Sequence, residues 1–361
     1  MTPSNQSSSP HSNGSQRRTP DGRSSQAIEA TTLNFTDLTL MHQFLTATCI
    51  DLPGPAGKED FWRANIIHIS RESPFVLHLV LALSALHLVH LNSGSPDQQR
   101  TYVDSGERHL QAGLRGSIAL LQQLDPTKFQ PLYLSAVLAC FCTFARGPTQ
   151  NELMLLGGDD GALVAWFPML RGVRSIAEKA GPDLLTTGEL AAGKKLWAQD
   201  PSPSIRSRRA GQRPDWERPV AALRDHIAAG IDIVEISPCL DALDSLAMSF
   251  ETAYGRVDCT KPGDAVDQFI FTWFYRLRDE YIECLRRKIP HAVVVLAYVM
   301  VLLKAMDYFW FVIGWPEHIM AVIRGLLSED LRAWLVWPED QLAKMISRTN
   351  VSSQDENHQG P

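Results

Sequence analysis

The sequence has few cysteines, and no two of them are spaced as a metal-binding C-x2-C pair. The six cysteines lie scattered between Cys49 and Cys284, and Cys140 and Cys142 would point to different faces of a helix. A disulfide framework is not expected in a chain of 361 residues without a secretory signal. We therefore expect buried, reduced thiols, no zinc cluster and no other cofactor.

Motifs of common catalytic sites are also missing. The sequence contains no G-x-S-x-G and no H-E-x-x-H. The Gly-rich run 157–161 lacks the Lys-Ser/Thr that completes a phosphate-binding loop. These absences favour a protein that is not an enzyme, and they make the Gly-rich run a loop between helices.

Long uninterrupted apolar runs and an excess of positive charge are absent as well. Polar residues interrupt 74–91, and 289–303 is shorter than the ~20 residues that cross a bilayer. The net charge of −6 gives no general attraction to nucleic acid. We predict no membrane span, and DNA contact only indirectly or through a separate N-terminal module.

Helical periodicity dominates what is present, and no alternating strand pattern occurs. The pattern predicts an all-α fold, a single large domain of about ten to twelve helices around an apolar core or pocket. The predicted helices or helical segments are 36–50, 59–70, 74–91, 98–124, 130–145, 162–179, 220–227, 240–254, 266–287, 290–311 and 316–327, with a closing turn to 338.

The segment 74–91 is the most informative helix, because almost every position is apolar and it must be buried on all sides. Ser73 stands before Pro74 as a predicted N-cap. His87 and His90 are spaced i, i+3, which suits a metal, but no neighbouring ligand completes a site. We expect hydrogen bonds from these histidines to the backbone or Ser84, with a ligand hydroxyl as the alternative.

Composition divides the chain into three parts. Residues 1–33 are Ser- and Asn-rich and predict a disordered tail or linker, and 349–361 predict a second disordered tail. Between them, 34–348 form the helical domain. Residues 191–217 are basic and Pro-rich, which indicates a flexible loop; a nuclear-import patch or a phosphate-binding surface is the functional alternative.

Four segments follow one another along the chain: LTLMHQFLT (38–46) followed by Phe61-Trp62, SPFVLHLVLALSALHLVHL (73–91), FPMLRGVRSI (167–176), and the Trp-Pro-rich ending 315–338. In this order they resemble the C-terminal regulatory domain of fungal Zn(2)-Cys(6) zinc-cluster transcription factors of the sterol-uptake-control type. The resemblance covers about 34–340. The family's zinc-cluster module, with its pattern of paired cysteines, is absent from this sequence.

The resemblance implies a pocket for a sterol or another apolar small molecule among the helices. Three strongly apolar helices could wall such a pocket, and the alternative for each residue is an ordinary core position. The candidate lining residues are Phe75, Leu79, Leu83, His87, Phe141, Phe144, Tyr298, Leu302, Met306 and Phe309.

Gly314, before Trp315-Pro316, predicts a sharp turn between helices. Our hypothesis is that it is a hinge through which ligand binding is transmitted to the C-terminal helices. Gly314→Asp is expected to place a charge in an apolar seam.

The resulting prediction is a ligand-responsive regulator of RNA polymerase II transcription. It would act in the nucleus, with shuttling from the cytoplasm, and form homo- or heterodimers with related factors. The alternative is an interaction or dominant-negative subunit without its own DNA-binding module, serving a metabolic gene cluster.

Overall fold

The computed structural model describes residues 35–52, 58–123, 125–157, 162–180, 213–230, 233–261, 263 and 269–345. The predicted tails 1–33 and 349–361 and most of the basic loop 191–217 lie outside these residues. Within the described part there are helices and no strand, apart from isolated bridges that join Leu156 to Leu153 and Leu163. The all-α prediction is confirmed.

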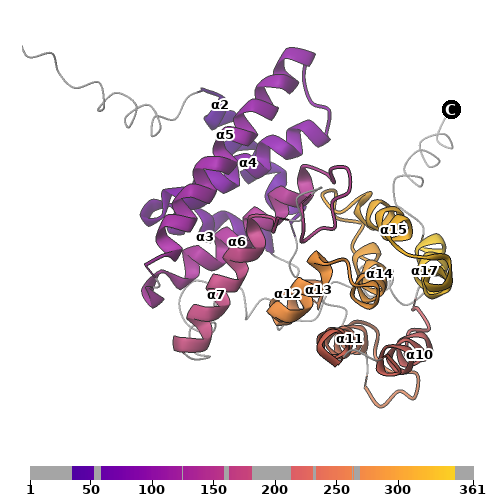
Figure 1. The fold of residues 1–361 in the computed structure, drawn as a ribbon. Coiled ribbons are helices and arrows are strands. Elements are labelled where there is room, and N and C mark those ends of the chain that lie inside the picture. Colours follow the sequence, from indigo (N-terminus) through magenta and orange to yellow (C-terminus); the bar gives the residue numbers. More distant parts are fainter. Residues whose placement is uncertain are drawn as a thin grey trace, which may run out of the picture.

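The helices form two groups that lie side by side (Figure 1). The first group is α2 (Phe35–Thr46), α3 (Lys58–Glu72), α4 (Pro74–His90), α5 (Pro96–Leu121), α6 (Phe129–Ala145) and α7 (Trp166–Ala180), with the 3-10 turns η1 (Thr48–Ile50) and η2 (Pro126–Lys128). The second is α10 (Glu217–Ala228), α11 (Ile233–Tyr254), α12 (Phe269–Arg276), α13 (Asp279–Arg286), α14 (Pro290–Lys304), α15 (Trp315–Leu326), α16 (Glu329–Arg332), η4 (Ala333–Leu335) and α17 (Val336–Lys344).

Helix α4 is buried as predicted, and its neighbour α5 approaches it closely because α5 carries glycine at the contact. A Cβ atom on Gly113 would stand 2.6 Å from Cγ of Leu79, so only glycine fits there without a shift. Ser73 does occupy the N-cap of α4, but its side chain makes no capping hydrogen bond. Pro74 at the first helical position, which needs no N–H partner, starts the helix instead.

The predicted helix 266–287 is divided in the structure, where α12 ends at Arg276 and α13 begins at Asp279. The guanidinium of Arg174 in α7 donates to the backbone oxygens of Tyr275, at 2.7 Å, and Leu277, at 3.5 Å. Those carbonyls would otherwise be unpaired at the end of α12. A side chain about a hundred positions earlier in the chain therefore supports the break, and it also ties α7 to the second group.

The predicted helix 290–311 is also shorter than expected, because α14 ends at Lys304. The residues that follow form a series of turns rich in aromatic side chains. We call 305–314 the bridging segment, since it connects α14 to α15 and packs against the first group of helices. Phe309, Phe311 and Val312 of this segment are buried.

One buried apolar cluster extends from Phe44 in α2 to Met345 after α17, so the two groups share a core. Trp166 of α7 packs edge-on against Phe274 of α12, with ring centroids 5.5 Å apart. No described helix is long and apolar enough to cross a membrane. All six cysteines are free thiols, and all except Cys259 are buried.

Candidate functional site

The residues predicted to line a ligand pocket are core residues on α4, α6, α14 and the bridging segment. All are buried except Phe75, which is half-buried against Gly116 of α5. The structure brings some of them together and separates others. The buried members are Leu79, Leu83, His87, Phe141, Phe144, Tyr298, Leu302, Met306 and Phe309.

Phe141 and Phe309 meet through an aromatic side chain that sequence reasoning did not single out. The ring of Phe311 lies 5.0 Å from that of Phe141 and stacks on that of Phe309 at 5.5 Å. The sequence did not predict this contact, because in a continuous helix 290–311 Phe311 would lie at the C-terminal end of that helix. The turns of the bridging segment bring Phe311 onto α6 instead.

Phe144 has a second aromatic partner at the start of α15. The ring of Trp315 contacts that of Phe144 edge-on at 5.1 Å, and its indole Nε1 donates to the backbone oxygen of Phe144 at 2.9 Å. Trp315 is completely buried, so this hydrogen bond satisfies a polar group that has no access to water. The bond fixes the first residue of α15 to the C-terminal turn of α6.

Tyr298 lies apart from these aromatics, within the second group. Its ring is 5.0 Å from that of Trp337 in α17, and burial raises the pKa of its phenol far above the usual value. A phenol in this environment stays protonated and acts as a core aromatic. The predicted residues thus occupy at least two neighbourhoods of one core.

His87 is an internal hydrogen-bonding histidine, although its partners are not the predicted ones. Its Nδ1 lies 2.9 Å from Oγ1 of Thr48, its Nε2 lies 3.5 Å from Oδ2 of Asp51, and its ring stacks on Trp310 at 4.7 Å. Ser84 donates to the backbone oxygen of Val80 instead. Burial lowers the pKa of His87, and Asp51 opposes this shift. The neutral imidazole therefore joins η1, α4 and the bridging segment.

Gly314 occupies a left-handed conformation with φ of +84° at the N-cap of α15. It is exposed, and a Cβ atom placed on it would meet nothing within 4 Å. The expectation that Gly314→Asp puts a charge into an apolar seam is wrong for this reason. The constraint on this position is the backbone conformation, which side-chain-bearing residues adopt at a cost.

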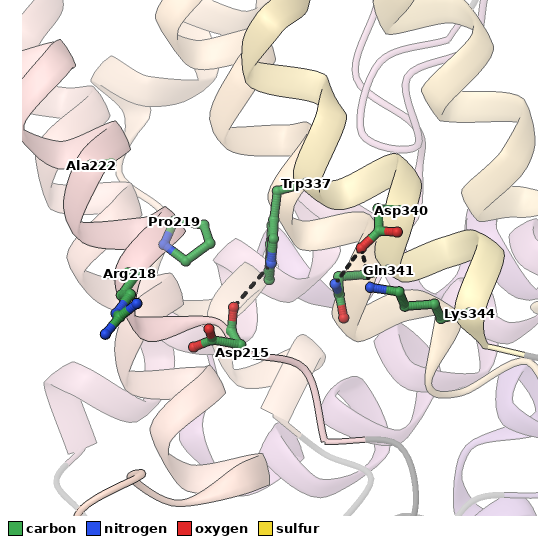
Figure 2. Close-up of a pocket in the computed structure, with 8 residues that line it drawn as sticks. All are labelled: Asp215, Arg218, Pro219, Ala222, Trp337, Asp340, Gln341 and Lys344. Carbon is green, nitrogen blue, oxygen red and sulfur yellow. Dashed lines mark hydrogen bonds and ion pairs between the residues drawn. The ribbon is translucent and has the colours of Figure 1, made fainter.

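A groove of about 450 Å³ lies between α10 and α17, and none of the predicted residues lines it (Figure 2). Trp337 crosses the groove, and its Nε1 donates to the backbone oxygen of Asp215 at 3.0 Å. Lys344 pairs with Asp340 at the other side. The lining residues are Asp215, Arg218, Pro219, Ala222, Trp337, Asp340, Gln341 and Lys344. The groove joins residues far apart in the sequence, so no local pattern indicated it.

The comparison with protein families adds a finding on the first group of helices. Residues 40–198 match the family of the fungal specific transcription factor domain. The matched range begins within α2 and includes α3 to α7. It contains six of the predicted lining residues: four on α4 and Phe141 and Phe144 on α6. No curated protein matches the chain. The predicted sterol-uptake-control subtype stays a prediction.

Proposed function

We propose that this protein is a fungal transcriptional regulator whose helical domain acts by binding and not by catalysis. The observation that carries the proposal is the match of 40–198 to the fungal specific transcription factor domain. The all-α architecture of the described residues agrees with it. The protein would act in the nucleus.

The finer part of the proposal is that the domain responds to a sterol or a similar apolar molecule. The support is the resemblance of 73–91 and the Trp-Pro ending to the sterol-uptake-control type. Aromatic side chains are also concentrated where α4 and α6 meet the bridging segment and the start of α15. A ligand would enter this core by displacing side chains of the bridging segment. Binding would then favour one arrangement of the two groups of helices. Gly314, at the end of that segment, remains our proposed hinge.

A reporter assay in fungal cells tests both parts of the proposal. The chain is fused to a heterologous DNA-binding module, and reporter transcription is measured in sterol-replete and sterol-depleted cells. A transcriptional regulator changes reporter output relative to the module alone, and a sterol-responsive one changes it by about threefold or more between the two conditions. The purified chain should also melt at a higher temperature with saturating ergosterol, since a ligand of the native state stabilises it.

The outcomes separate the alternatives. A fusion that is expressed in the nucleus but leaves reporter output unchanged would refute the regulator. A reporter effect that is the same in sterol-replete and sterol-depleted cells, with no change in melting temperature on addition of ergosterol, would refute the ligand response alone. If that sterol-independent effect is repression and the chain co-purifies with a related factor, the interaction or dominant-negative subunit is the correct function.

A further inference from the structure

Three polar side chains from three helices form a hydrogen-bonded chain in the first group. Oδ1 of Asp37 in α2 lies 3.0 Å from Nε2 of His109 in α5. Nδ1 of His109 lies 2.8 Å from Nδ1 of His78 in α4. Asp37 and His109 are 4% and 5% exposed, whereas His78 is partly buried. Such a chain in a core must have its donors and acceptors matched.

The geometry assigns a proton to each link of this chain. A carboxylate only accepts, so Nε2 of His109 carries the proton that is donated to Asp37. In neutral His109 the other nitrogen, Nδ1, is then an acceptor, and Nδ1 of His78 must be the donor. Among the nitrogens of the two rings, the remaining site for an added proton is Nε2 of His78. A second added proton, on Nδ1 of His109, would set two N–H groups against each other across 2.8 Å.

The two imidazole rings can therefore hold one additional proton without losing a hydrogen bond, and even this proton is disfavoured. Burial lowers the pKa of His78 below its usual 6.5, and the neighbouring His109 and Arg115 of α5 lower it further, while Asp37 of α2 opposes them. When the folded-state pKa of a histidine is lowered, the native state binds fewer protons than an opened state does below pH 6.5. Stability is then complete above pH 6.5 and falls as the pH drops through the lowered pKa.

Helix α2 depends on these hydrogen bonds for its position more than the neighbouring helices do. Of its twelve residues only Asp37, Leu40 and Phe44 are buried, whereas α4 and α6 bury most of their side chains. Phe35 and Leu38, on its outer side, are 86% and 58% exposed. A short helix with so few buried contacts is expected to open locally before the core does. Opening would expose the His78 ring to water and let it take a proton.

We propose that Asp37, His109 and His78 form an acid-sensitive fastening that holds α2 against α4 and α5. At neutral pH the hydrogen bonds among Asp37, His109 and His78 are intact, and α2 packs against α4 and α5. In acid, proton uptake by His78 favours the state in which α2 has detached. This inference is independent of the proposed regulatory function.

Hydrogen–deuterium exchange of the α2 amides, corrected for the intrinsic effect of pH, tests the proposal on the whole chain. Between about pH 7.5 and about pH 5.5, protection of α2 should fall by about threefold or more. His78→Asn removes the titrating group and keeps a donor near the position of Nδ1. This variant should lose most of the pH dependence. His42→Asn, on the exposed side of the same helix, should keep it.

Two results would overturn the fastening. One is α2 protection in the wild type that does not change with pH. The other is a His78→Asn variant with the full wild-type dependence, which would place the acid-sensitive group elsewhere, for example at His87. If the variant does not fold, an NMR titration of the wild-type histidines decides the matter. A His78 ring that titrates at or above pH 6.5 contradicts the proposal.

Discussion

At the scale of single residues, polar side chains within the core contact residues that are far away in the sequence. His87 contacts Thr48 and Asp51, about forty positions away, and His109 contacts Asp37, which is 72 positions away. The sequence predicted that the α4 histidines are buried hydrogen-bonding groups, and this is confirmed for His87. Their partners could not be predicted, because periodicity describes only which residues share a face of one helix.

The glycine at the start of α15 gives a prediction at this scale. Gly314→Ala should destabilise the protein by about 1 kcal/mol, because alanine pays a steric cost at positive φ. Gly314→Asp should cost less than Gly314→Ala, because aspartate tolerates the left-handed conformation better and its carboxylate lies at the N-terminus of α15. Gly325→Ala is the matched control: it lies within α15, also meets no atom within 4 Å, and should be neutral or stabilising. Urea denaturation measures all three. Equal effects at both glycines would contradict the role of the backbone conformation.

At the scale of elements, the connection between α14 and α15 departs most from the sequence prediction. Lys304 ends α14 with a side chain that is 3% exposed, and its Nζ lies 2.9 Å from Oδ2 of Asp307 and 2.6 Å from Oε1 of Glu317. The lysine thereby joins the last turn of α14 to the first turn of α15 across the bridging segment. This ion-pair network holds the turns that present Trp310 and Phe311 to the first group.

Removing the lysine charge should loosen this connection. Lys304→Met keeps the apolar stem and leaves Asp307 and Glu317 without their shared cation, so we expect a loss of about 2–3 kcal/mol in the free energy of unfolding. The control is Lys344→Met, which breaks the exposed pair with Asp340 and should cost at most about 1 kcal/mol. Chemical denaturation gives both values. A loss no larger than that of the control would show that the network does not hold the segment.

At the scale of the whole molecule, the family match and the folding unit have different limits. The match ends at residue 198, but the buried cluster continues to Met345. Phe141 and Phe144 of the matched region are covered by Phe311 and Trp315, which lie beyond it. The first group of helices therefore needs the second to cover its apolar surface.

A truncated chain tests this dependence. Residues 34–198 alone should expose the apolar face of α6, bind a hydrophobic dye such as ANS and lack a cooperative thermal transition, because a large buried area is lost. The full chain should unfold in a single calorimetric transition. A fragment that melts cooperatively and binds no dye would show that the two groups are independent domains.

The sequence by itself determined the helical class, the burial of α4 and most helix positions, because hydrophobic periodicity and helix-starting residues act within a few positions along the chain. Only the tertiary structure decided where α14 ends, how 266–287 divides, and which candidate residues meet. Arg174, which lies in a different helix, stabilises the break after α12. Phe311 contacts Phe141 only because 305–314 forms turns that the local sequence did not predict. Contacts of this kind depend on the packing of distant segments, and that information is not local to any stretch of sequence.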